Sequence, residues 1–422
     1  MFRSTNRRRR SAVSPSPACI QTLETRQLLS AAPLNADQPI VGLPAGTLSQ
    51  IQPAVMPTAT GIVSVAVSRA GEVSIVGDSA ANFVAIELSH DGLQISGWGT
   101  GTLIRMAGQK LSDTVTVPLR TNLNSTVVRS LSISLGAGDD TLRLQFSNNV
   151  TISRDLSISM GSGHDFVDIS LAQADVEINR DLLLDLAGGH DRGVINLYAD
   201  STLVSSRDVS IRAGAGDDTL LIMDHTSISG DKLSSPELFQ QQPDTTASAQ
   251  SQPFRAQRDL TLDLGAGSDG LTVLASEAGR NFSILAGIGT DTITASNTRA
   301  GRQFRVTDAD AVVLQNLTVV GPLTLTGTDQ HDRAWLSRVS AVRIDADFAD
   351  GNDQLVLQHN ILARTTAIFE GGRGLNQTTA SSSQKTANLL RFTTSLTEDS
   401  ALELLAGILA ASPQPAFTIM AL

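Results

Sequence analysis

The chain has 422 residues, of which 41% are hydrophobic and only 4% aromatic. Its net charge is −11, but residues 1–30 hold six Arg and one Glu, a net charge of +5, which leaves −16 on the rest. Contacts to phosphate depend on Lys and Arg, so this acidic body with only three Lys argues against a nucleic-acid partner. The single cysteine, Cys19, excludes a disulfide framework and a cysteine-based zinc site.

Residues 1–60 are predicted to be an export or processing segment and linker, mostly disordered. The basic run Arg7–Arg10 is followed by Ser-, Pro- and Ala-rich sequence with little periodicity. Residues 23–31, Leu-Glu-Thr-Arg-Gln-Leu-Leu-Ser-Ala, resemble the LEPR-XLL segment near the N-terminus of large exported proteins of planctomycete bacteria, with Thr25 in place of proline. The resemblance implies an extracellular or cell-surface location. The alternative is a short disordered tail with a chance pair of leucines.

Residues 61–107 form alternating apolar and polar runs such as Val63–Val67, typical of strands, and are predicted to be an N-terminal β segment or cap. No apolar run reaches the roughly 18 residues of a membrane-spanning helix, so no transmembrane segment is expected.

A repeated Gly-x-Gly-x-Asp turn then dominates the sequence. The last aspartate of the turn recurs at Asp140, Asp165, Asp191, Asp218, Asp269 and Asp291. Successive turns lie 22 to 27 residues apart, except for one step of 51 residues after Asp218. The Ser-, Thr- and Gln-rich stretch 229–254 falls within that step and is predicted to be a disordered loop between two adjacent coils.

A second marker fixes the register of the repeat. An arginine stands 11 residues before the turn aspartate in five units, at Arg154, Arg180, Arg207, Arg258 and Arg280. The strand-plus-turn unit therefore has a constant length while the return path varies, which is how a solenoid accepts insertions.

These patterns predict an all-β protein, a right-handed parallel β-helix (β-solenoid) of about ten coils over residues 108–375. A coil of 22 to 27 residues suits a three-sided coil, whereas the alternative, an antiparallel β-sandwich, requires no constant offset. Ser112–Val115 is a candidate first coil, and the repeat decays after residue 300. Residues 376–422 are predicted to be a loose segment and a short C-terminal helical cap, Glu398 to Ala411, over the open edge.

The turn resembles half of the calcium-binding RTX nonapeptide, Gly-Gly-x-Gly-x-Asp-x-aliphatic-x. The resemblance implies a ladder of Ca²⁺ ions held by the six turn aspartates, because calcium takes about six to eight oxygens, which stacked loops could supply. The alternative is that each aspartate caps its own turn through backbone N–H groups. Any such ladder is expected to end near residue 300.

Two other columns suggest weaker hypotheses. The arginine column is expected to be a solvated salt-bridge edge, with a polyanion-binding stripe as the alternative. His164 and His190 precede their turn aspartates and could hold a transition metal.

The function that fits this sequence is that of an exported structural, adhesive or matrix-associated surface protein rather than an enzyme, with cell-envelope or extracellular-matrix components as partners. A polysaccharide-active β-helix, a lyase or glycosidase, is the alternative, with residues 308–353 as its only candidate region. A third possibility is a secreted protein that carries the solenoid as its own export or folding signal.

Overall fold

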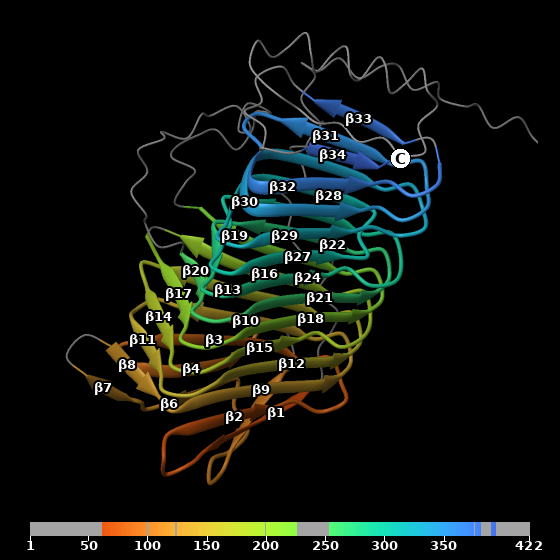
Figure 1. Cartoon of the computed structure of the whole chain (residues 1–422). Helices are drawn as coiled ribbons and strands as arrows, with labels where there is room; N and C mark the ends of the chain where they lie inside the picture. Colours follow the sequence, from red (N-terminus) through yellow and green to blue (C-terminus); the bar gives the residue numbers. More distant parts are fainter. Residues whose placement is uncertain are drawn as a thin grey trace, which may run out of the picture. The chain divides into compact units, whose positions relative to one another are not determined.

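The computed structural model describes residues 61–98, 101–122, 125–198, 200–225, 253–374, 376–380 and 390–393. Within these residues the chain contains strands and no helix, and it forms a parallel β-solenoid of about nine turns (Figure 1). The predicted all-β solenoid is therefore confirmed. The predicted N-terminal segment 1–60, the predicted loop 229–254 up to residue 252, and the predicted C-terminal helix, Glu398 to Ala411, lie outside the described residues.

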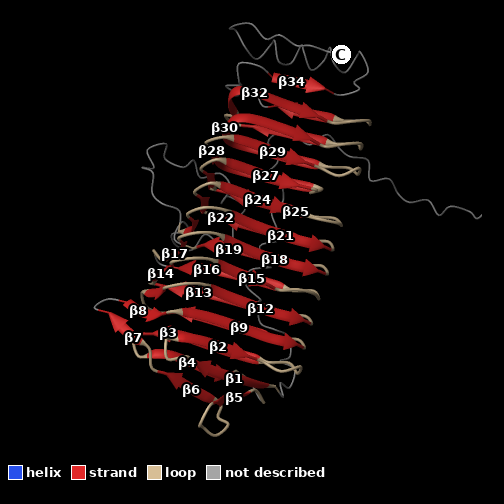
Figure 2. Ribbon diagram, turned by 60° about the horizontal axis from the view of Figure 1, so that its bottom comes forward, coloured by secondary structure: helices blue, strands red, loops and turns tan. Residues whose placement is uncertain are grey.

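Each coil contributes one strand to each of three faces. The coil of β17 (Thr202–Ser205), β18 (Val209–Ala215) and β19 (Thr219–Asp224) is representative. The Arg207 corner separates β17 from β18, and the Gly-x-Gly-x-Asp turn separates β18 from β19. Each of the three strands pairs in parallel with its equivalents in the coils on either side. Figure 2 shows the strands stacked along the solenoid.

The first face follows the arginine corner. Its strands are β2 (Glu72–Val76), β9 (Ser130–Ala137), β12 (Leu156–Ser162), β15 (Leu182–Asp185), β18, β21 (Leu260–Ala266), β24 (Asn281–Leu285), β27 (Gln303–Thr307), β29 (Pro322–Thr326) and β34 (Leu390–Thr393). The second face follows the turn. Its strands are β3 (Phe83–Ser89), β10 (Thr141–Phe146), β13 (Phe166–Ala172), β16 (Arg192–Tyr198), β19, β22 (Gly270–Leu274), β25 (Thr292–Ser296), β31 (Gln354–Gln358) and β33 (Gln377–Ala380).

The third face is built of short strands. They are β8 (Ser125–Val128), β11 (Val150–Ile152), β14 (Asp175–Ile178), β17, β20 (Phe254–Ala256), β23 (Ser276–Ala278) and β26 (Arg299–Ala300). Toward the C-terminal end, strands run from one face into the next. These are β28 (Ala311–Val319), β30 (Arg333–Asp347) and β32 (Leu362–Glu370).

The core is a set of stacked aliphatic rows. In β21, Leu260, Leu262 and Leu264 are buried, while the alternate residues Thr261 and Asp263 lie on the outer side. Parallel pairing places each inward residue on its equivalent about 4.8 Å away, so the rows run along the whole stack. Burial of each such side chain contributes about 1.5–3 kcal/mol. This accounts for a core that needs few aromatic residues.

The stack begins earlier than the predicted residue 108. β2 already pairs in parallel with β9, and β3 pairs with β10. The remaining N-terminal strands, β1 (Ile62–Val67), β4 (Gly92–Gly97) and β5 (Leu103–Met106), complete this end together with β6 (Thr114–Val117). The candidate first coil at 112–115 is wrong, because β6 pairs antiparallel with β4. A further hairpin joins β7 (Arg120–Asn122) to β8.

The step of 51 residues is a single coil with an insertion. β19 pairs directly with β22, and β18 pairs directly with β21, so no coil lies between them. The direct pairing confirms that no coil lies between the two turns, as predicted, but β20 already begins at Phe254, within the predicted loop 229–254.

The turn glycines allow the coils to approach closely. Gly216 has φ +128°, and a Cβ there would overlap the carbonyl oxygen of Gly189 in the preceding coil. Gly270 lies just past the next turn, where a Cβ would meet only Asp218 O at 3.9 Å.

We expect Gly216→Ala to lower the free energy of unfolding by about 2 kcal/mol or more, because both the φ angle and the backbone contact exclude a side chain. The matched substitution Gly270→Ala is expected to change it by less than about 1 kcal/mol. Urea unfolding followed by circular dichroism measures both. Equal effects of the two substitutions would contradict the close approach.

Candidate functional site

The six turn aspartates form one buried column, here called the inner aspartate column. The members Asp140, Asp165, Asp191, Asp218, Asp269 and Asp291 are only 0% to 3% exposed. Each carboxylate accepts a hydrogen bond from the backbone N–H of its equivalent in the preceding coil. The N–H of Asp165 donates to Asp191 Oδ1 at 2.8 Å, and that of Asp191 donates to Asp218 Oδ1 at 2.7 Å. In this column each carboxylate therefore accepts a backbone N–H of the neighbouring coil rather than one of its own turn.

The column continues beyond the predicted limit. At its start, the N–H of Asn82 donates to Asp140 Oδ1 at 2.7 Å. At the other end, the N–H of Asp291 donates to Asp310 Oδ2 at 2.8 Å. Further on, Asp332 N–H donates to Asp353 Oδ1 at 3.0 Å. The aspartate hydrogen bonds therefore continue past residue 300, because these turns keep the aspartate after losing the glycine pattern, while the predicted end of a calcium ladder there stays a prediction.

Asp332 is the exception to the coil-to-coil rule. Its Oδ2 accepts the N–H of Thr328, four residues earlier in the same turn, at 2.8 Å. The alternative in which an aspartate caps its own turn therefore holds at this position. The sequence signal that identifies Asp310, Asp332 and Asp353 is an aspartate directly before a second-face strand.

One oxygen of each inner carboxyl lacks a protein partner. The buried Oδ2 atoms of all six column members accept no hydrogen bond within the described residues. Burial raises the pKa of Asp140 and Asp165 to about 7, and that of Asp218, Asp269 and Asp291 to about 6. The N–H donors lower these pKa values, and neighbouring carboxylates in the column raise them further. The column therefore holds protons more tightly than exposed aspartates do.

Calcium binding at the inner aspartate column stays a prediction. The column presents one open oxygen per coil, whereas calcium takes about six to eight oxygen ligands. Within the described part of the chain, no three His, Cys, Asp or Glu side chains come together as a metal site. The open oxygens are buried, and this burial makes the six carboxyls harder to ionise than exposed aspartates.

The residues just before the inner column form an outer column that bonds in the opposite direction. His164 N–H donates to Asp139 Oδ1 at 2.8 Å, and His190 N–H donates to His164 Nδ1 at 2.9 Å. Asp217 N–H donates to His190 Nδ1 at 2.8 Å. The two imidazole rings stack with centroids 5.1 Å apart and planes within 7°. Lone pairs of parallel rings point the same way, so the pair does not converge on a transition metal.

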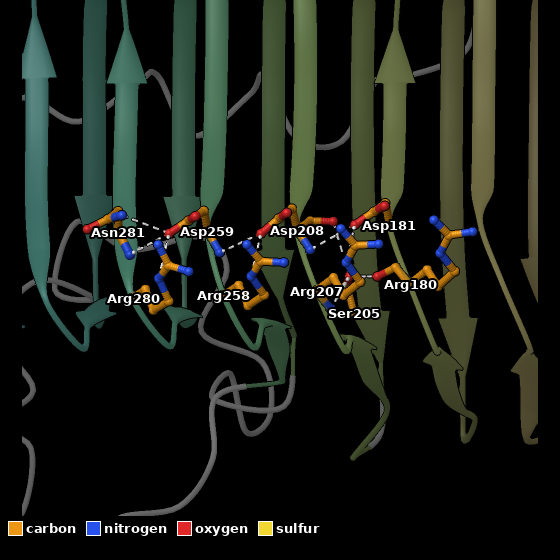
Figure 3. Close-up of polar contacts among 9 residues, drawn as sticks. All are labelled: Arg180, Asp181, Ser205, Arg207, Asp208, Arg258, Asp259, Arg280 and Asn281. Atoms are coloured by element: carbon orange, nitrogen blue, oxygen red, sulfur yellow. Dashed lines mark hydrogen bonds and ion pairs between the residues drawn. The ribbon is translucent and has the colours of Figure 1, made fainter.

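The corner between the third and first faces carries a ladder of arginines and aspartates (Figure 3). Arg207 Nε lies 3.7 Å from Asp181 Oδ1, and Arg258 Nε lies 3.6 Å from Asp208 Oδ1. Arg180 and Arg280 pair in the same way with Asp155 and Asp259. The same aspartate oxygens also accept backbone N–H groups of the following coil. Since the four arginines are 39% to 45% exposed, each ion pair contributes under about 1 kcal/mol.

A polar cluster on the second face was not predicted from the sequence. Asn196 Nδ2 donates to Asp168 Oδ1 at 3.2 Å, and Asn196 Oδ1 lies 3.0 Å from His225 Nε2. The ring of Tyr198 stacks on His225 with centroids 4.4 Å apart. Burial raises the pKa of Tyr198 and lowers that of His225. The equivalent positions vary between coils, with Arg143 and Val194 opposite Asp168 and with Ser170 and Met223 opposite Asn196, so no repeated signal in the sequence marks the cluster.

Comparison with known proteins gives no relative. No protein-family model matches the chain, and neither the curated proteins nor the solved structures include a match. Among the described residues there is no helix long and apolar enough to cross a membrane.

The inner column makes stability depend on pH. Its folded pKa values lie above the ordinary 3.8, so its contribution is complete below about pH 4 and is lost as the pH rises through 6 to 7. We expect the melting temperature to fall between about pH 5 and about pH 8. Asp165→Asn keeps the acceptor for Asp140 and removes one titrating group, so its fall is smaller. Asp263→Asn, on the outer side of β21, is the control with wild-type behaviour. A melting temperature that rises with pH would refute this explanation.

The same column allows a direct test of calcium. At about pH 8 the column is largely deprotonated, so a calcium site would be free to fill; if none forms, millimolar calcium leaves the melting temperature of the full chain within about 1 °C of its value in chelator. A rise of several degrees that Asp191→Asn and Asp218→Asn abolish, and magnesium does not reproduce, would instead establish the calcium ladder. Calorimetry or circular dichroism provides the readout.

Proposed function

We propose that the chain is an exported structural or adhesive protein of the cell surface or its surrounding matrix. The observation that carries the proposal is that the repeated polar residues are engaged between coils. The inner aspartates, the outer column and the corner aspartates each bond a backbone N–H of an adjacent coil. Residues used in this way stabilise a scaffold and leave its outer faces available for contacts.

The uniformity of the ladders supports the same proposal. A catalytic centre usually gathers unlike groups in a concave pocket of several hundred Å³. At the C-terminal edge of the predicted enzyme region, the cavity lined by Phe348, Asp353 and Leu355 measures about 10 Å³, room for about one water molecule. The inner column also reaches this region at Asp353, which accepts the N–H of Asp332 as elsewhere, whereas the Asp332 carboxylate caps its own turn.

Export is the part of the proposal that rests on residues 23–31. The resemblance of this segment to LEPR-XLL sequences supports a location outside the cytoplasm, where a stable repeat scaffold would meet envelope or matrix components. Calcium is a further possible stabiliser of this scaffold, and the calcium experiment described above addresses it separately.

The experiment is expression of the full chain, with a C-terminal tag, in a planctomycete host. We expect the tag to be accessible to antibody on intact cells or to be found in the medium. A variant that lacks residues 23–31 is expected to stay inside. A full chain retained in the cytoplasm would contradict the proposal.

A second assay separates the scaffold from the polysaccharide-active alternative. Purified full chain, incubated with neutral and acidic polysaccharides, is expected to release no new reducing ends and no unsaturated sugars. Release of either, and its loss on substitution of Asp168 or His225, would move the assignment to an enzyme.

A further inference from the structure

The arginines at the corner between the third and first faces form a regular row with outward donors. We call this row the arginine corner; its members are Arg154, Arg180, Arg207, Arg258, Arg280 and Arg302. For Arg180, Arg207, Arg258 and Arg280, the contact to aspartate is made through Nε. Their half-exposed guanidinium groups still have terminal N–H donors, and Figure 3 shows them following one another along the corner. Neighbouring strands of the stack lie about 4.8 Å apart.

The charge balance of this corner changes along the stack. Arg180, Arg207 and Arg258 each form an ion pair with the corner aspartate of the preceding coil, so the positive and negative charges compensate each other. From Arg280 onward the companion residue is neutral, Asn281 in one coil and Gln303 in the next. Arg280 forms an ion pair with Asp259 of the preceding coil. At the same position relative to Arg302, the preceding coil has the neutral Asn281.

Two more arginines flank this uncompensated end. Residues 299–307 contain Arg299, Arg302 and Arg305 and no acidic residue. Arg302 and Arg305 are exposed, and the buried Nε of Arg299 has no protein partner among the described residues. Across the strand, Arg299 faces Glu277, whose carboxylate pairs with Arg255 at 3.7 Å. Arg299, Arg302 and Arg305, next to the ion-paired Arg280, thus form a basic cluster on an acidic protein.

We propose that the basic cluster, continued along the arginine corner, binds an extended anionic polysaccharide through its carboxylate or sulfate groups. The inference deepens the proposed function, because it names the matrix component that the scaffold would contact. It rests on that function, since only a protein at the cell surface or in the matrix would meet such a polysaccharide. Guanidinium groups donate paired hydrogen bonds to carboxylate and sulfate oxygens, and a straight row of them matches a polymer with anions at regular intervals.

The features of the corner favour a polysaccharide over a nucleic acid. Binding of single-stranded nucleic acid uses aromatic side chains on which bases stack. The phenylalanines nearest this corner, Phe282 and Phe304, are buried in the core. The phosphate backbone also carries a denser charge, which the net −16 of the chain outside residues 1–30 repels more strongly.

The test measures binding of purified full-length chain to polygalacturonate, dextran sulfate and neutral dextran. We expect both anionic polymers to bind, neutral dextran not to bind, and added salt to weaken the affinity. Replacement of Arg299, Arg302 and Arg305 by Gln is expected to weaken binding about tenfold or more, since several charge contacts are lost together. The charge-matched control replaces exposed Arg69, Arg105 and Arg333 by Gln and is expected to stay within about twofold.

The remaining outcomes each decide the proposal. A triple Arg→Lys variant of the cluster, which keeps the charge, is expected to retain most of the affinity. If the triple Gln variant does not fold, the single substitution Arg302→Gln takes its place and is expected to weaken binding. Absence of binding to both anionic polymers, or equal weakening by the control substitutions, overturns the inference. Tighter binding to single-stranded DNA or to anionic vesicles than to either polymer also overturns it. Because binding is measured on purified protein, failure here leaves the proposed surface location intact.

Discussion

The structure depends on hydrogen bonds from a backbone N–H at each turn to a side chain of an adjacent coil. Parallel stacking brings the turn of every coil against the next one, and it leaves an N–H at the aspartate position without a backbone acceptor. A buried N–H without a partner costs about 1–3 kcal/mol. The carboxylate of the following coil supplies the acceptor, as when Asp165 N–H donates to Asp191. This requirement explains why one residue type recurs at one place in nearly every coil.

Bonds in both directions hold each coil between its neighbours. An inner aspartate accepts an N–H from the preceding coil, whereas an outer residue such as His164 and a corner residue such as Asp181 accept from the following coil. The closely packed turn glycines make this possible, because a side chain at Gly216 would hold two turns apart. One oxygen of each inner carboxyl stays unpaired, so burial raises the pKa of the column and a bound proton stabilises it.

The sequence predicted the fold well because its strongest signals are local and repeated. Period-two alternation identified strands such as Leu260–Ala266, and the constant offset between Arg207 and Asp218 identified the coil. The N-terminal boundary was missed because Asn82, which takes the turn position next to Asp140, lacks the surrounding glycines. The turns that end at Asp310, Asp332 and Asp353 belong to the decayed part of the repeat and were not assigned to the column, because they lack the paired glycines.

The site was predicted less fully because contacts between coils leave no local pattern. The Asp191 carboxylate accepts a hydrogen bond from the preceding coil rather than from its own turn. This choice depends on the direction in which the side chain leaves the turn, which the sequence does not reveal. The cluster of Asp168, Asn196 and His225 joins residues of three successive coils, and the sequence gives no spacing rule for it. The neutral companion beside Arg280 is visible in the sequence, but its meaning depends on the pairing with the coil before it.

Hydrogen–deuterium exchange on Asp218→Ala tests the central claim most directly. The substitution removes the acceptor of the Asp191 N–H and leaves every backbone N–H and C=O group of the turn at 214–218 in place. If side chains hold the preceding coil, protection is lost first in the turn at 187–191. Loss confined to the turn at 214–218, or no loss in either turn, would contradict the account.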